Sequence, residues 1–422
     1  MSTSQHRPNV DVERIARRID ALAALTEPDR PYTRRAFTDL YLRARDWLRS
    51  EFEGAGLEVH LDAGANLIGK RRGSEPGRSA LAVGSHVDTV VGGGRFDGIA
   101  GVVAGLEAAQ ALRESGTTLR HDLWVVDFLS EEPSDYGASC VGSRALAGTL
   151  SPAMLQGKNP AGETLDAAIR RMGGRPEDLG SPLVQDLAAF LELHIEQGPV
   201  LMQESKRIGI VEGIVAIHRV TLTVQGQAAH AGTTPMSMRR DALVGAARIV
   251  DNVWTQAREL ASREQFVATI GRFDVAPNGA NVVPGSVRLI VEARALDVTL
   301  VERFLHETVA RSRELGDELG LEVTSELTST AAAAKCDARV IAALEQSCRN
   351  RETPFRRMSS GAGHDAMQVA TVAPMGMVFI PCKDGISHNP AESARAEDVA
   401  AGAEVIADAL VTLDASGRSP AA

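Results

Sequence analysis

The chain has 422 residues, of which 44% are hydrophobic and 24% charged; this is typical of a folded protein with two or three domains. Its formal net charge of −10 at pH 7 argues against nucleic acid or an anionic membrane as a partner. The N-terminus lacks the apolar core of a signal peptide, and no apolar run reaches about 18 residues, so we expect a cytoplasmic protein without membrane spans.

Residues 10–212 are predicted to form the first segment of an α/β domain. Apolar residues recur at helical spacing over residues 10–25 and 35–52, which predicts two helices. Continuous apolar runs, typical of strands buried on both faces of a mostly parallel sheet, occupy residues 80–85, 122–129 and 190–195. The apolar segment 98–112 lies between the first two runs and predicts a crossover helix flanking the sheet.

Residues 213–330 have a different pattern, which predicts an inserted α+β domain of βαββαβ type. Alternating polarity predicts half-exposed antiparallel strands at residues 218–226, 266–275 and 286–296. Helical stretches at about 237–262 and 298–319 lie between and after them. Residues 331–415 resume the first pattern, with helices expected at 331–348 and 396–413 and a buried strand at 372–381. We therefore expect a catalytic domain in two segments, interrupted by the insertion.

Acidic and histidine side chains follow the predicted strands. They are His86, Asp88, Asp97, Glu131, Glu132, His194, Glu196 and His388. Taken singly, such a histidine is commonly structural and adjacent glutamates are commonly a solvated pair. Because ligands gather at the carboxyl ends of strands in an open α/β sheet, these side chains are expected to converge. Burying several of them is costly unless they are paired or coordinated, so their coincidence predicts a metal site.

Imidazole and carboxylate ligands together suit zinc, and also manganese, cobalt or nickel. The adjacent glutamates Glu131 and Glu132 cannot both point the same way on an extended backbone. One of them can therefore bind metal, while the other acts as a general base on the water that the metal activates.

Six ordered motifs carry a family resemblance over roughly residues 12–413. They are "GSHVDTVVGGGRFDGIAG", "ELHIEQGPVL", "HAGTTPMSMRRDAL", "NVVPG", "SGAGHDA" and "GISHNPAE". With these motifs the chain resembles the hydantoinase/carbamoylase family of zinc-dependent amidohydrolases, part of a wider group of aminoacylase-like and carboxypeptidase-like exopeptidases. The resemblance implies two divalent metal ions per subunit, with zinc expected and manganese, cobalt or nickel as alternatives.

The resemblance also implies a role for each ligand position. His86 and His194 would hold one metal, Glu132 and His388 the other, and Asp97 would bridge them. Asp88 would orient His86 from behind. Glu131 would be the general base.

The inserted domain would serve as a lid and dimerisation domain, which implies a homodimer. His230 would stabilise the oxyanion, commonly in the partner subunit's site, with the help of Asn281, and Arg294 would clamp a substrate carboxylate. Gln197 would contact the ureido group, and His218 and Gly363 are further candidate substrate contacts. Alternatives stay open from the residues alone: Arg294 as a surface cation, Asn281 as a turn residue, His230 as a cap, and His364 as a residue that orders its loop.

The expected reaction is hydrolysis of a linear amide or ureido bond, with an N-carbamoyl-L-amino acid as substrate and the amino acid, carbon dioxide and ammonia as products. Allantoate, β-ureidopropionate and N-acyl amino-acid amides are alternative substrates, and a non-catalytic binding protein of the same fold is an alternative of another class. The loop Pro133–Tyr136 replaces a Gly and an Arg-Phe pair of many relatives. Ile217 and His218 stand where relatives that act on allantoate tend to carry Gln-Arg, which weakens allantoate.

Overall fold

The computed structural model describes residues 7–184 and 186–416, and the chain divides into two compact units. The first unit comprises the chain up to Glu212 and from Lys335 onward, and the second comprises Gly213–Ala334. Among the described helices, none combines the length and apolarity needed to cross a lipid bilayer.

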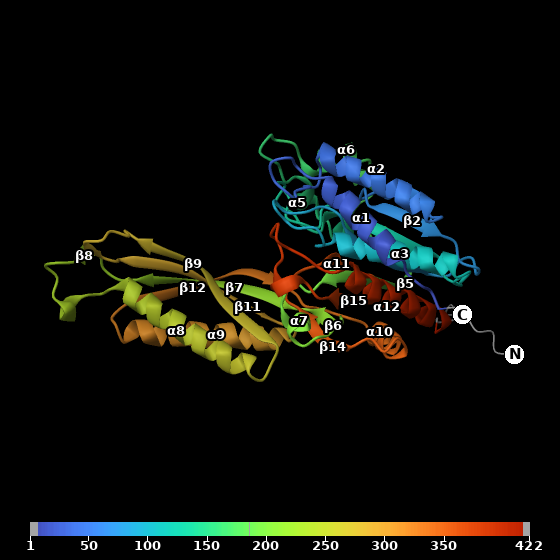
Figure 1. The fold of residues 1–422 in the computed structure, drawn as a ribbon. Coiled ribbons are helices and arrows are strands. Elements are labelled where there is room, and N and C mark those ends of the chain that lie inside the picture. The colour runs from blue at the N-terminus through green and yellow to red at the C-terminus, as the bar shows by residue number, and fades with distance from the viewer. Residues whose placement is uncertain (1–6, 185, 417–422) are drawn as a thin grey trace. The chain divides into compact units, whose positions relative to one another are not determined.

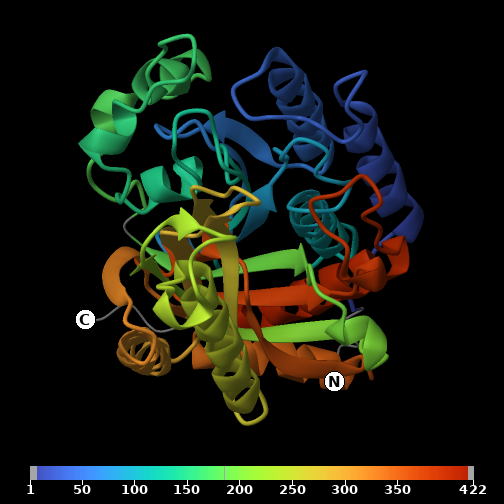
Figure 2. The same ribbon diagram turned by 90° about the vertical axis from the view of Figure 1, so that its left-hand side faces the viewer.

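A mixed sheet lies at the centre of the first unit, in the order β1-β2-β4-β3-β5-β15-β6-β13, with β14 also pairing with β6. Its strands are β1 (Glu58–Leu61), β2 (Leu67–Arg71), β3 (Ala80–His86), β4 (Leu123–Phe128), β5 (Leu187–Ile195), β6 (Ile208–Ile214), β13 (Ala334–Lys335), β14 (Phe355–Ser360) and β15 (Met375–Ile380). The inner strands β4, β3, β5 and β15 run parallel to one another. On the two sides of these four, β2 pairs antiparallel with β4, and β6 pairs antiparallel with β15. Figure 2 shows β15 in red between the green strands β5 and β6.

Helices cover both faces of this sheet. They are α1 (Val12–Ala24), α2 (Asp39–Gly54), α3 (Ile99–Glu114), α4 (Val141–Leu146), α5 (Pro152–Leu155), α6 (Leu165–Arg171), α7 (Val200–Gln203), α10 (Ala338–Asn350), α11 (Asp365–Val369) and α12 (Ala396–Ala415), with 3-10 turns η1 (Pro176–Asp178) and η3 (Lys383–Gly385). Leu193 of β5 packs at Gly402 of α12, while its neighbour Glu192 accepts a hydrogen bond from the amide of Ala366 in α11. Because consecutive strand residues point to opposite faces, α12 and α11 lie on opposite sides of the sheet.

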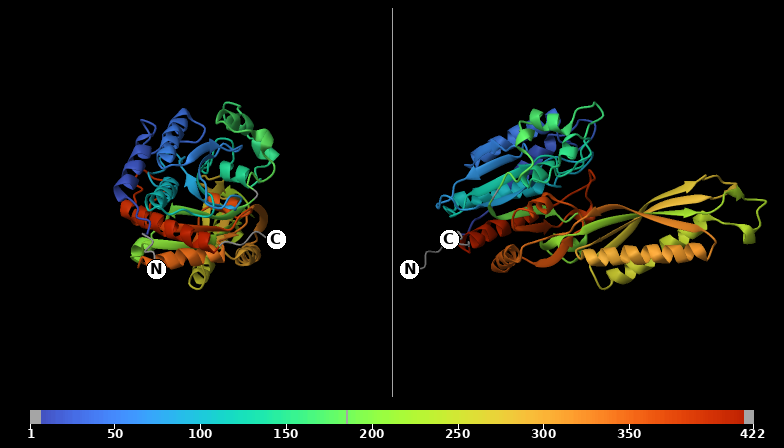
Figure 3. Two further views of the ribbon diagram at one scale, coloured as in Figure 1. Left: turned by 90° about the vertical axis from the view of Figure 1, so that its right-hand side faces the viewer. Right: turned by 180° about the vertical axis from the view of Figure 1, so that it is seen from behind.

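The crossover helix α3 is buried almost all round and packs beside α12 (Figures 1 and 3). Gly101 explains its close approach to the sheet, since a Cβ atom there would lie 2.2 Å from the carbonyl oxygen of Leu193. The predicted βαβ arrangement and mostly parallel central sheet are confirmed.

The second unit is a four-stranded antiparallel sheet in the order β12-β7-β11-β9, covered on one face by α8 and α9 (Figure 1). Its elements are β7 (Ala216–Gln225), β8 (Ala229–His230), η2 (Met236–Met238), α8 (Ala242–Ala261), β9 (Phe266–Ala276), β10 (Val282–Val283), β11 (Ser286–Ala295), α9 (Val298–Asp317) and β12 (Glu322–Ala331). Alternate residues of β7 and β11, such as Leu222 and Leu289, enter the core under the helices. The predicted βαββαβ unit with one open sheet face is therefore confirmed.

The helix expected over residues 331–348 begins later, at Ala338. Ala334 and Lys335 instead form β13 at the sheet edge, and Asp337 accepts hydrogen bonds from the amides of Arg339 and Val340 as an N-cap. The run of alanines favours a helix locally, but strand pairing and the cap set where the helix starts.

Candidate active site

The candidate metal ligands of the first unit lie at the carboxyl ends of its parallel strands. His86 is the last residue of β3, His194 lies one residue before the end of β5, and Glu131 and Glu132 follow β4. Asp97 precedes α3, and His388 lies on the loop after β15. Since β3 lies between β4 and β5 in the sheet, these strand ends bring the side chains to one edge, as the sequence indicated.

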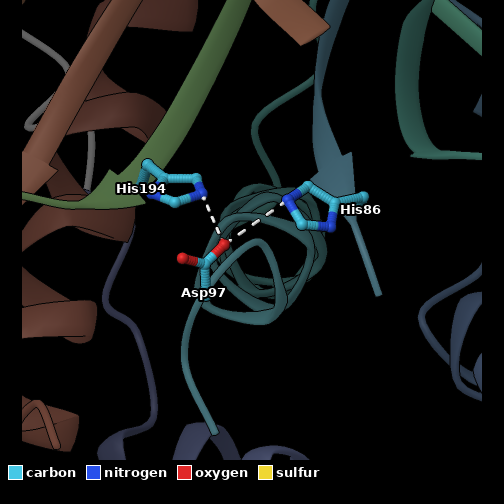
Figure 4. A group of neighbouring side chains, drawn as sticks. All are labelled: His86, Asp97 and His194. Atoms are coloured by element: carbon cyan, nitrogen blue, oxygen red, sulfur yellow. Dashed lines mark ion pairs between the residues drawn. The ribbon is translucent and has the colours of Figure 1, made fainter. Parts of the chain in front are cut away.

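Two histidines face one oxygen of Asp97. Oδ1 of Asp97 lies 3.3 Å from Nε2 of His194 and 3.7 Å from Nε2 of His86. Figure 4 shows the two imidazoles approaching this carboxylate from opposite sides. All three side chains are buried. These atoms form the first of two groups that could hold a metal ion.

The second group uses the other oxygen of Asp97. Oδ2 of Asp97 lies 3.4 Å from Nε2 of His388, and the same nitrogen lies 3.4 Å from Oε1 of Glu132. His388 is half exposed, whereas Glu132 is buried. Asp97 is therefore common to both groups.

The chemistry of these groups fits two divalent cations. Ligand atoms at about 2.0–2.2 Å from a tetrahedral ion lie roughly 3.3–3.6 Å apart, close to the separations of 3.3–3.7 Å around Asp97. Nε2 of His86 and Oε1 of Glu132 are also buried without a hydrogen-bond partner among the described residues. Leaving such atoms unpaired is costly, and a bound cation would satisfy both.

The turn before α3 is shaped so that Asp97 can approach the histidines. Gly98 has a φ of +66°, and a Cβ atom on it would lie 2.3 Å from the His86 ring. The amide of Gly98 donates to Nε2 of His194 over 3.1 Å. Only glycine combines this backbone conformation with the space that the imidazole needs.

Three further side chains hold Asp97 in place. Oδ2 of Asp97 accepts hydrogen bonds from Nε2 of Gln197 at 2.7 Å and from the hydroxyl of Ser387 at 2.9 Å. The buried carboxylate of Glu392 accepts from the backbone amides of Phe96 and Asp97 and from the Ser387 hydroxyl. Gln197, predicted to contact substrate, thus also positions Asp97, while its buried Oε1 has no hydrogen-bond partner among the described residues.

Asp88 contacts both His86 and the backbone of Glu131 and Glu132. Its carboxylate accepts from the amides of Glu131 and Glu132, each at 3.2 Å, and its Oδ1 lies 3.5 Å from Nδ1 of His86. The same nitrogen of His86 lies 3.0 Å from the Asp88 carbonyl oxygen. Asp88 therefore orients both the imidazole and the backbone that carries the adjacent glutamates.

Glu131 points toward the first group. Its Oε2 lies 3.6 Å from Nε2 of His86, and its Oε1 accepts a hydrogen bond from the thiol of Cys140 at 3.4 Å. Burial raises the pKa of Glu131 well above its usual value, and the neighbouring Glu132 raises it further. Of the two adjacent glutamates, only Glu132 belongs to a group that could hold a metal ion.

In the metal-free site, the imidazoles and the carboxylates stabilise each other's charged forms. Burial opposes charge on His86, but Asp88 and Glu131 still raise its pKa well above the usual value. The hydrogen bond to Asp97 raises the pKa of His388 to about 9, and burial raises that of Glu132 to about 7. Burial opposes the ionised form of Asp97, yet His194 and the other imidazoles hold its pKa well below the usual range. Metal binding must displace the protons that this arrangement retains.

Glu196, expected from its position to be a candidate ligand, serves another purpose. Its two carboxylate oxygens accept from the amides of Val200 and Leu201, each at 2.8 Å, at the start of α7. Neither metal-binding group includes it. The carboxylate faces along the chain rather than toward Asp97, because the free amides of a helix start offer it nearby donors.

The remaining predicted site residues lie in the loop before α11 and in the second unit. Gly363 is exposed in the loop before α11, next to His364, whose ring lies 4.5 Å from that of His194. In the second unit, His230 is exposed on β8, and Asn281 lies beside it, accepting at its carbonyl from the amide of Ala231 over 2.9 Å.

Two further predicted residues lie on neighbouring strands of the second unit. Arg294 lies on the open face of its sheet and pairs with Glu292 at 2.7 Å, which also pairs with Arg219. His218 is buried on β7 opposite Ala293.

Sequence reasoning missed the roles of Glu392 and Ser387, although both lie in the quoted motif "GISHNPAE". The available signal was their spacing from His388, since Ser387 lies one residue before it and Glu392 four residues after it. That spacing alone does not reveal that both side chains contact the Asp97 turn, which lies 290 or more residues away in the chain.

The chain is similar to known proteins over most of its length. The family model of peptidase family M20/M25/M40 matches residues 82–412. N-carbamoyl-L-amino acid amidohydrolase of Geobacillus stearothermophilus is 37% identical over 397 residues, covering 93% of this chain and 96% of the relative. Allantoate amidohydrolase of Escherichia coli is 33% identical over 389 residues, covering 92% and 94%.

A solved structure extends the match to the whole fold. The crystal structure of an amidase of the hydantoinase/carbamoylase family from Burkholderia multivorans is 35% identical and has a TM-score of 0.90, covering 96% of this chain and 98% of that one. The chain belongs to peptidase family M20/M25/M40, a family of metal-dependent hydrolases. Within it, the chain is a hydrolase of the hydantoinase/carbamoylase amidases.

Proposed function

We propose that this hydrolase cleaves the ureido carbon–nitrogen bond of an N-carbamoyl-L-amino acid, giving the L-amino acid and carbamic acid, which decomposes to carbon dioxide and ammonia. The observation that carries the proposal is the shared carboxylate of Asp97, which joins two potential metal-binding groups beside the buried Glu131. The N-carbamoyl-L-amino acid amidohydrolase of Geobacillus stearothermophilus, 37% identical, supports the choice of substrate.

Two divalent cations, with zinc as the metal and manganese, cobalt or nickel suited to the same ligands, would be held by five side chains. His86 and His194 would hold one, Glu132 and His388 the other, with Asp97 between them. When bound, such ions polarise a carbonyl group and make water acidic enough to ionise near neutral pH.

Glu131 is the proposed general base. Its Oε2 would accept a proton from the attacking water and then deliver it to the leaving nitrogen, so one carboxylate serves both half-steps. The Cys140 thiol and the Asp88-bound amide of Glu131 would hold it in place meanwhile.

The second unit is proposed to recognise substrate and to act as a lid and dimerisation domain. Arg294 would bind the α-carboxylate through its planar guanidinium group, and His230, assisted by Asn281, would stabilise the oxyanion. Gln197, His218 and Gly363 are proposed as further substrate contacts. In a homodimer, His230 would complete the partner subunit's site.

A panel of substrates tests this proposal. Metal-reconstituted protein would be assayed by kcat/KM with N-carbamoyl-L-amino acids, N-carbamoyl-D-amino acids, β-ureidopropionate, allantoate and N-acetyl-L-amino acids. We expect the highest kcat/KM with an N-carbamoyl-L-amino acid, and little turnover of its D-enantiomer. A higher kcat/KM with allantoate or β-ureidopropionate would identify that compound as the substrate instead. If none of these compounds were turned over, a binding protein would be favoured over an enzyme.

A further inference from the structure

A cavity lined by arginines lies at the opposite end of β4 from the candidate active site. Arg71 is the last residue of β2 and Arg72 follows it, while Arg113 lies in the last turn of α3. Together with Thr117, Thr118 and neighbouring residues of the loop that leads into β4, they line a cavity of about 190 Å³. We refer to it as the arginine pocket.

Among the described residues, no carboxylate forms an ion pair with the arginines of the arginine pocket. Nη1 of Arg71 donates to the carbonyl oxygen of Ala109 at 2.8 Å, but its Nη2 is buried and makes no hydrogen bond among the described residues. Within the part of the chain that the structure describes, Arg113 donates only to the carbonyl oxygen of Gly54, at 3.2 Å. Carbonyl groups accept hydrogen bonds without neutralising the cation, so the pocket keeps its charge.

The acidic residues around the arginine pocket are engaged elsewhere. Asp122 accepts from the amide of Gly73 at 2.8 Å, and Glu114 pairs with Arg14 at 2.9 Å. No aspartate or glutamate is among the described residues that line the pocket. In a chain with a net charge of −10, this is a local excess of positive charge.

The arginine pocket is also electrostatically unfavourable without a ligand. Burial and the nearby charge of Arg113 both lower the pKa of Arg71. A bound anion would offset that repulsion.

We infer that the arginine pocket binds a small oxyanion of the phosphate class, such as inorganic phosphate or the phosphoryl group of a phosphomonoester. Planar guanidinium groups donate paired hydrogen bonds that match phosphate oxygens, and the hydroxyl of Thr118 adds a further donor at the pocket. The six residues of β4 separate this pocket from the metal-binding edge by about 20 Å, so it is distinct from the proposed active site.

The test measures binding of inorganic phosphate to the metal-loaded protein by isothermal titration calorimetry, against sodium chloride at equal ionic strength. The variants are Arg113→Gln and Arg72→Gln. Arg43→Gln is the matched control, because Arg43 is exposed on α2 of the same unit and its loss changes the net charge equally. Circular dichroism checks that each variant folds, and Arg72→Gln, at an exposed position, keeps the test valid if Arg113→Gln does not.

We expect phosphate affinity to fall at least about tenfold in Arg113→Gln, because a charge-assisted hydrogen bond is lost. Arg72→Gln should weaken binding several-fold, and Arg43→Gln should bind within twofold of the unaltered protein. Absence of binding to the unaltered protein would overturn the inference. Equal phosphate affinity in Arg72→Gln and Arg43→Gln would also overturn it, because phosphate would then bind outside the arginine pocket. If phosphate bound at the metals, it would inhibit turnover equally in all variants.

Discussion

The two units distribute their polar side chains in opposite ways. In the first unit, four potential ligands from separate chain segments surround Asp97, all of them buried except the half-exposed His388, and two of their atoms have no hydrogen-bond partner among the described residues. In the second unit, His230 is exposed and Arg294 is neutralised by Glu292. The first arrangement is incomplete without a cation, whereas the second is electrostatically satisfied by itself.

This difference indicates a division of labour. A buried cluster of imidazoles and carboxylates fits metal binding, because coordination offsets the cost of desolvation. Side chains on an open sheet face or at the sheet end keep their hydration until a ligand arrives. We therefore expect changes in the first unit to affect metal content and kcat, and changes in the second to affect KM.

The largest effect is expected at Asp97. Asp97→Ala should remove both metal ions and abolish activity, because Asp97 belongs to both metal-binding groups. His194→Ala should remove one ion, since His194 belongs to the first group only. Metal content measured by inductively coupled plasma mass spectrometry distinguishes the two, and retention of two ions in Asp97→Ala would contradict the shared ligand.

Glu131→Gln should separate metal binding from chemistry. We expect kcat to fall about 100- to 10,000-fold, because the amide cannot accept the proton, while metal content and KM stay near those of the unaltered protein. Cys140→Ser is the matched control, because the hydroxyl can still donate to Oε1 of Glu131. Near-normal kcat in Glu131→Gln would show that another group is the base.

Arg294→Gln tests the second unit. Loss of a charged hydrogen bond to the substrate carboxylate should raise KM about tenfold or more, with metal content unchanged. Arg288→Gln is the control, because Arg288 is exposed on the same strand β11 and has no proposed role. If both variants gave the same KM, Arg294 would be a surface cation and not the carboxylate clamp.

The smallest effect is the pH dependence of metal uptake. The pKa of His388 is raised to about 9 in the metal-free protein by its hydrogen bond to Asp97, so below that pH the imidazole must lose a proton before it binds metal. Zinc affinity at the second group should therefore rise with pH up to about 9 and then level off. Calorimetry in buffers of different ionisation enthalpy measures the released proton, and uptake without release at pH 7.5 would contradict the assignment.

Sequence patterns predicted much of both units because the patterns are local. The apolar runs that became β3, β4 and β5 are continuous, as expected of strands buried on both faces. The alternating runs became the half-exposed strands β7 and β11 and the edge strand β9, which is mostly exposed beyond Phe266. Residue type and position after a strand selected eight candidates, among them His86, Asp97, Glu132, His194 and His388, which the fold brings together. The family resemblance was needed to single out these five as ligands.

Contacts between distant segments were decided by the tertiary structure alone. Glu196, like Glu132, is a glutamate that follows a strand, yet it caps the start of α7. Glu392 accepts a hydrogen bond from the amide of Asp97, which lies 295 residues away in the chain. The arginine pocket likewise joins the ends of β2 and α3, which no periodicity relates. Periodicity reports which face of an element is apolar, but the partner of each polar side chain depends on which distant backbone groups the fold places within hydrogen-bonding reach.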